Sequence, residues 1–103
     1  MGINLNLETE RGEVLQSLLD PEGTMARLLS PYCNINVYPM LGSIDPYGDT
    51  VFNRIQMGLF LGEWSKVLAK NLSPEERVVA DQIEKLAQRC RDEVHLYLKF
   101  IGD

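Results

Sequence analysis

Histidine and cysteine are scarce in this sequence, and their scarcity limits the chemistry that it can perform. His95 is the only histidine, and Cys33 and Cys90 are the only cysteines among 103 residues. The two cysteines fit no spacing of metal ligands, so we expect two reduced thiols and no bound metal. Neither of them has a neighbouring catalytic partner in the sequence, so we expect no catalytic residue and no cofactor.

The chain also lacks an excess of positive charge. Its 10 Lys and Arg residues are outnumbered by 15 Asp and Glu residues, which gives a net charge of −5. This balance argues against nucleic acid or an anionic membrane as a partner, and it is compatible with a basic protein partner. Charged residues interrupt the longest apolar stretch too soon for a membrane-spanning helix. With no secretory signal peptide visible at its start, we expect the protein to be cytoplasmic.

Length and composition indicate an ordinary globular protein. Hydrophobic residues make up 45% of the chain and charged residues 24%, both typical of soluble domains. A chain of 103 residues can bury one core and is too short for two. We therefore predict a single domain over residues 1–103.

The most informative stretch runs from Asp45 to Asn71. Asp45-Pro46-Tyr47-Gly48 has the residues that a type I turn prefers. Asp49 or Thr50 could then cap a helix, and no proline occurs from residue 51 until residue 74. We predict a long, mostly apolar helix that begins near Val51 and occupies the centre of the domain.

Two stripes of side chains follow from helical spacing in this stretch. The first is made of small residues and includes Gly58 and Gly62, which cost roughly 1 kcal/mol each relative to alanine inside a helix. We expect the backbone of another element to pack closely there. The second stripe is bulky and includes Met57, Phe60 and Trp64. We favour packing against a sheet for this stripe, and the alternative is an interface with a partner.

Three further segments precede the central stretch. Residues 3–7 alternate apolar and polar side chains, as a half-buried strand does. Residues 14–19 fit either a helix or, across an Arg11-Gly12 turn, the second strand of a hairpin, and we favour the hairpin. A short helix is predicted near residues 24–30, and Ile35 and Val37 indicate a short strand.

The C-terminal third is easier to interpret. Ser73-Pro74-Glu75-Glu76 has the form of a capping box at the start of a helix. Apolar residues then recur at helical spacing to about Glu93, after which Leu96, Leu98 and Phe100 alternate with polar residues. We predict an α+β fold: a small, mainly antiparallel sheet of three or four strands, two long helices packed on one face, and one short helix.

One group of polar residues is a candidate binding site: Asp45, Tyr47, Asp49, Asn53 and Arg54. Free N–H groups at a helix N-terminus could hold a small anion or the carboxylate of a partner. The two aspartates oppose an anion, because they already place negative charge there. The favoured interpretation is structural, with the aspartates forming the turn and the cap and Arg54 pairing with an acid.

Two functions of different classes remain compatible with these observations. The first is a non-catalytic interaction or regulatory protein that forms a homodimer through the central helix, one version being an immunity or inhibitor protein with a basic partner. The alternative is a small-molecule-binding domain or minor enzyme that uses the region Asp45–Arg54. A deep pocket ringed by polar groups would favour the alternative.

Overall fold

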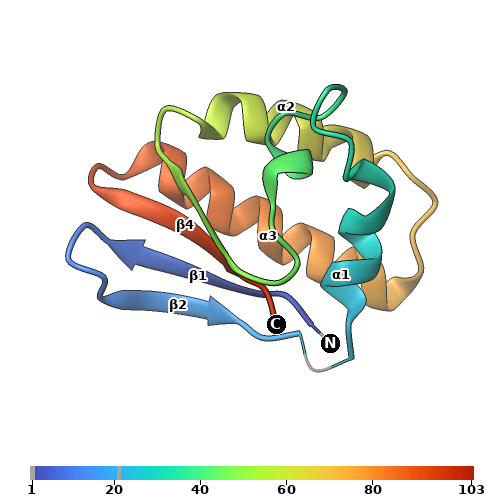
Figure 1. Cartoon of the computed structure of the whole chain (residues 1–103), viewed down its shortest axis with the longest axis horizontal. Helices are drawn as coiled ribbons and strands as arrows, with labels where there is room; N and C mark the ends of the chain where they lie inside the picture. The colour runs from blue at the N-terminus through green and yellow to red at the C-terminus, as the bar shows by residue number, and fades with distance from the viewer. Residues whose placement is uncertain (1, 21) are drawn as a thin grey trace.

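A four-stranded antiparallel sheet forms one layer of the molecule (Figure 1). The structure is a computed structural model that describes residues 2–20 and 22–103. The strands are ordered β2-β1-β4-β3 across the sheet. Their bounds are Asn4–Thr9 for β1, Val14–Leu18 for β2, Asp49–Asn53 for β3 and Leu96–Ile101 for β4.

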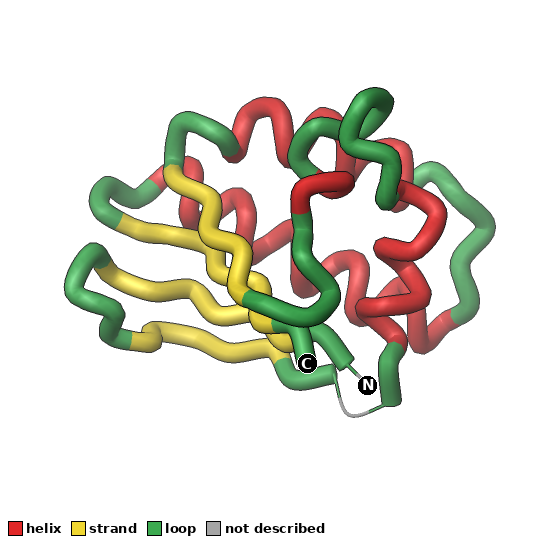
Figure 2. The backbone as a smooth tube through the Cα atoms, viewed as in Figure 1, coloured by secondary structure: helices red, strands yellow, loops and turns green. Residues whose placement is uncertain are grey.

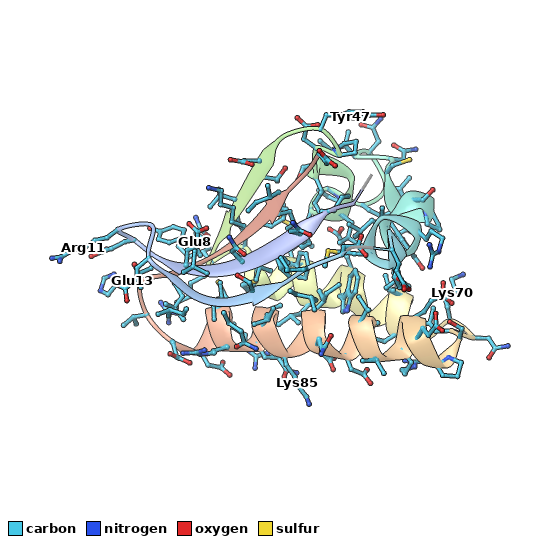
Figure 3. The ribbon with its side chains drawn as sticks, turned by 90° about the horizontal axis from the view of Figure 1, so that it is seen from below. Glu8, Arg11, Glu13, Tyr47, Lys70 and Lys85 are labelled. Carbon is cyan, nitrogen blue, oxygen red and sulfur yellow. The ribbon has the colours of Figure 1, made fainter. Side chains whose placement is uncertain are left out.

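Helices form the second layer and cover one face of the sheet. They are the short α1 (Thr24–Leu29), α2 (Met57–Leu68) and the longest, α3 (Pro74–Asp92). Figure 3 shows α3 running along the sheet, with Lys85 pointing away from it into solvent. The predicted α+β class, with an antiparallel sheet, two longer helices and one short helix, is confirmed.

The side chains of β1 and β4 alternate between the core and the opposite face of the sheet. Leu98 and Phe100 are fully buried, whereas Tyr97 and Lys99 between and beside them are half-buried. Leu5 of β1 pairs with Phe100 across the ladder. The predicted C-terminal strand is therefore correct, and its apolar side chains face the core as expected. Successive side chains of a strand point to opposite faces of the sheet, so the alternating residues bury one face.

The predicted hairpin is also correct. Residues 10–13 connect β1 to β2, and a 2.9 Å hydrogen bond from Thr9 N to the Glu13 carbonyl encloses the three residues Glu10, Arg11 and Gly12. Gly12 has a φ of 82°, a value that glycine adopts with little strain and other residues seldom do. A glycine of this kind at the end of a three-residue loop is a common hairpin solution.

The start of α3 matches the sequence pattern. The Ser73 hydroxyl accepts a hydrogen bond from Glu76 N (3.2 Å), and Glu76 Oε1 accepts one from Ser73 N (3.0 Å). Both bonds of the capping box are therefore formed. Farther along the helix, Trp64 Nε1 donates to the Ala80 carbonyl (3.0 Å) and joins α2 to α3.

The predicted helix start near Val51 is wrong, because residues Asp49–Asn53 form β3 and the helix begins at Met57. Val51 and Phe52 have β-branched and aromatic side chains, which favour strands, and β4 offers them a pairing partner much later in the chain. The helix is not capped by Asp49 or Thr50. Its entry is instead a turn in which Asn53 and Gln56 exchange hydrogen bonds.

The strand predicted around Ile35 and Val37 is also wrong. Figure 2 shows the connection between α1 and β3 as loop with short helical turns. The Asn34 side chain accepts a hydrogen bond from Asn36 N (3.0 Å), and its carbonyl accepts bonds from the amides of Val37 and Tyr38. An Asn that bonds backbone two residues on forms a turn in place of an extended segment.

Candidate functional site

The turn at Asp45 uses its polar atoms to fix the backbone. Asp45 Oδ1 accepts a hydrogen bond from Tyr47 N (2.8 Å), and Asp45 N donates to Thr50 Oγ1 (2.9 Å). Gly102 N donates to the Gly48 carbonyl (2.7 Å), and a side chain at Gly102 would collide with the backbone of the turn. The turn therefore anchors the C-terminal residues, while the Tyr47 ring points outward (Figure 3).

Asn53 and Arg54 lie at the opposite end of β3. Four residue steps of about 3.3 Å place Asn53 about 13 Å along the strand from Asp49. The Asn53 side chain is engaged with Gln56, and Arg54 Nε donates to the Arg91 carbonyl (3.2 Å) near the end of α3. The five polar candidates therefore do not form one group. They were grouped on the expectation that a helix would begin near Val51, with all five residues around its start.

Asp49 makes its contact on the outward face of the sheet. Its carboxylate lies 3.6 Å from Lys99 Nζ on the adjacent strand β4. Surface ion pairs of this kind contribute little to stability, typically about 0–1 kcal/mol. Asp45, Asp49, Asn53 and Arg54 thus all make contacts within the fold, but only the Asp45 turn matches the structural interpretation. Asp49 pairs with Lys99 and caps no helix, and Arg54 donates to a backbone carbonyl where pairing with an acid was expected.

A buried carboxylate at Asp20 was missed from the sequence. Asp20 is 7% exposed and accepts hydrogen bonds from Ile3 N (3.3 Å), Met25 N (3.0 Å) and Ala26 N (3.2 Å). It supplies the capping that Gly23, at the N-cap of α1, has no side chain to provide. The available signal was an aspartate shortly before a predicted helix.

A second buried carboxylate, Glu63, holds the loop before β3. Its two oxygens accept hydrogen bonds from Met40 N (3.1 Å) and Leu41 N (2.9 Å), and the residue is 6% exposed. Helical spacing placed Glu63 on the polar side of α2, so no sequence signal identified this role. Because its hydrogen-bonding capacity is directed at backbone amides, Glu63 serves the fold.

The bulky stripe of α2 lies in the core. Met57, Phe60 and Trp64 are each 0% exposed. Phe60 stacks on Trp64 with ring centroids 5.9 Å apart, and it contacts Phe100 of β4 at the same separation. These three side chains are thus fully covered within the chain, and we do not carry them into a proposed interface.

The opposite side of α2 is exposed. We call this surface the outer face of α2 and define it by Gly58, Leu59, Gly62, Ser65, Lys66 and Ala69, all exposed. Cβ atoms added at Gly58 or Gly62 would meet nothing within 4 Å. The described part of the chain therefore does not supply the close packing of another backbone that we expected on the small stripe.

Of the cysteines and the histidine, only Cys90 is buried. Both cysteines are free thiols: Cys33 is exposed and Cys90 is buried. Burial raises the pKa of the Cys90 thiol to about 11, which keeps it protonated at neutral pH. His95 Nδ1 lies 3.3 Å from Glu10 Oε2 at the exposed hairpin end of the sheet. Among residues 2–20 and 22–103, no group of three His, Cys, Asp or Glu is placed to hold a metal ion.

Comparisons with protein-family models, curated proteins and solved structures found no match. No helix in the described ranges is both long and apolar enough to cross a membrane.

Proposed function

We propose that this protein is a non-catalytic interaction protein that forms a symmetric homodimer and binds a basic partner protein, as an immunity or inhibitor protein would. The cytoplasmic setting expected from its reduced cysteines belongs to the same proposal. The observation that carries it is the outer face of α2, an exposed helix surface with two glycines and a half-exposed leucine.

The glycines support pairing with a second copy. Gly62 lies inside α2 and lowers helix stability by about 0.8–1.0 kcal/mol relative to alanine, whereas Gly58 lies in the first turn. No contact with the described residues requires either of them to be small. Small residues allow two helix axes to approach closely, and helices in contact are about 8–10 Å apart. Leu59, which is 52% exposed, would add apolar area to such a contact. Twofold pairing lets one face serve both subunits.

The alternative of a small-molecule site over Asp45–Arg54 receives less support. Its residues lie at both ends of β3, and most of them are hydrogen-bonded or ion-paired within the fold. A binding site needs polar groups that converge on one cavity. We therefore retain the interaction protein as the proposal.

Amide NMR spectra of the dilute and the concentrated protein test the proposed surface. We expect concentration-dependent shifts at Gly58, Leu59, Gly62 and Ser65, because these amides would move into an interface. A Gly62→Arg variant should abolish the shifts, since a bulky charge would prevent close approach. Ser17→Arg, on exposed β2, is the matched control and should retain them. Shifts confined to other surfaces, or none at all, would reject this dimer.

A further inference from the structure

A surface hollow beside Leu19 combines an apolar floor with an acidic rim. It has a volume of about 330 Å³ and lies where the end of β2 meets the first turns of α1 and α3. We call it the acidic hollow; its lining consists of Leu19, Asp20, Glu22, Thr24, Glu75, Val78 and Val79. Figure 1 shows the start of α1 beside the N-terminal half of α3.

The floor exposes large apolar side chains. Leu19 is 67% exposed and Val78 is 57% exposed, while Val79 is half-buried beside them. Covering such side chains is favourable by about 25 cal/mol for each Å² of apolar surface removed from water. The floor can therefore accept an apolar side chain from a partner.

The rim carries negative charge that the fold does not neutralise with an ion pair. Glu22 and Glu75 are exposed, and neither takes part in the ion pairs found among the described residues. Asp20, by contrast, directs its carboxylate at three backbone amides. Arg27 is a neighbouring cation, and its guanidinium donates to the Glu22 carbonyl (3.0 Å) and the Thr24 hydroxyl (3.2 Å).

A second hollow, of about 510 Å³, extends the same surface on the other side of Leu19 and Asp20. Ile101 and Gly102 line it together with the exposed Asp103. Among the described residues, the linings of the two hollows contain acidic residues and no Lys or Arg. A ligand that spans Leu19 would therefore meet apolar contacts flanked by negative charge on both sides.

We propose that the acidic hollow binds a basic amphipathic segment of a partner protein, with an apolar side chain against Leu19 and Val78 and Lys or Arg beside Glu22 and Glu75. This inference rests on the proposed function and assigns its basic partner to a surface separate from the outer face of α2. The negative charge of the rim favours a basic segment as the occupant over a second copy of this chain. A second copy carries the same rim and the same net charge of −5, so pairing two hollows would bring like charges together.

Peptide titration of the ¹⁵N-labelled full chain tests this assignment. The probe is a synthetic helical peptide of Leu and Lys that groups its leucines on one face, and the control peptide replaces every Lys with Glu. We expect the Lys peptide to shift the amides of Leu19, Glu22, Glu75 and Val78 saturably. Added salt should weaken its binding, because exposed charges are screened. The Glu peptide should leave these amides unchanged.

A matched pair of charge variants makes the test specific. The double variant Glu22→Gln/Glu75→Gln should weaken binding of the Lys peptide by about three- to tenfold, which is the scale of two exposed ion pairs. Glu10→Gln/Glu13→Gln changes the net charge equally at the hairpin end of the molecule, and it should alter the affinity less than about twofold. Equal weakening by both pairs would overturn the inference, because it would show attraction by overall charge alone.

The remaining outcomes separate this inference from the proposed function. Lys-peptide shifts that map to another surface would overturn the acidic hollow while leaving an interaction protein. Shifts at the hollow on concentrating the protein alone would overturn it in favour of a second copy as occupant. If neither peptide binds, the inference is also overturned. A protein mass that stays at that of the monomer would count separately against the dimer.

Discussion

At the scale of single residues, two buried carboxylates hold loops in place by accepting backbone hydrogen bonds. Asp20 joins the N-terminal strand to α1, and Glu63 joins α2 to the loop at Met40 and Leu41. A buried amide that loses its acceptor costs about 1–3 kcal/mol. These residues are therefore more important to stability than their polar character indicates.

Glu63→Gln should lower the free energy of unfolding by about 1–3 kcal/mol. Glutamine offers one oxygen where the structure uses two, and its NH₂ group would face a backbone N–H. Urea unfolding followed by circular dichroism measures the loss. Glu13→Gln, on the exposed hairpin loop (Figure 3), is the matched control and should change stability by less than about 0.5 kcal/mol. Equal stability of both variants would contradict the role given to Glu63.

Cys90 should make stability fall as the pH rises above about 9. The thiol pKa is raised from 9.0 to about 11 by burial in the folded protein, so the folded state keeps a proton that the unfolded chain releases between these values. Stability contributed by the protonated thiol is complete below pH 9 and lost as the pH approaches 11. Urea unfolding of wild type and Cys90→Ala across this range should show a shallower decline in the variant. Parallel declines would contradict the assignment.

At the scale of elements, the capping box should be a measurable determinant of α3. Ser73→Ala removes the oxygen that accepts from Glu76 N, and we expect a loss of about 0.5–2 kcal/mol in the free energy of unfolding. Lys85→Ala is the matched control, because Lys85 lies exposed inside α3, where alanine is the better helix former. Thermal unfolding of both variants tests this pair. A larger loss for Lys85→Ala would contradict the account.

Elements with local signals were predictable from sequence, and β3 was not. The capping box and the period of two after Glu93 are encoded by neighbouring residues, so α3 and β4 were anticipated. Residues 49–53 form a strand because the edge of β4 is available, a partner distant in sequence. The Asp45 turn was likewise anticipated, but its association with Asn53 and Arg54 depended on the incorrect helix start.

The surfaces used in the two proposals could not be read from periodicity. Leu19 directly follows β2, Thr24 begins α1, and Glu75 and Val78 lie on α3, so only the packing of these elements brings them together. Helical spacing correctly separated the small and bulky stripes of α2. The favoured interpretation placed the bulky stripe in the core, and the burial of Met57, Phe60 and Trp64 agrees with it.

At the scale of the whole molecule, the two proposed surfaces differ in charge. Lys66 lies on the outer face of α2, whereas Glu22 and Glu75 border the acidic hollow. The separation allows one copy to occupy the α2 surface while a basic protein occupies the hollow. The dimer is the part of this account that requires no identified partner, so it can be tested first.

Light scattering coupled to gel filtration, across a series of protein concentrations, tests the dimer most directly. The account predicts a mass that rises with concentration from 11.7 kDa towards twice that value, and a Gly62→Arg variant that stays at 11.7 kDa. A wild-type mass of 11.7 kDa at every concentration, up to the highest accessible, would contradict it.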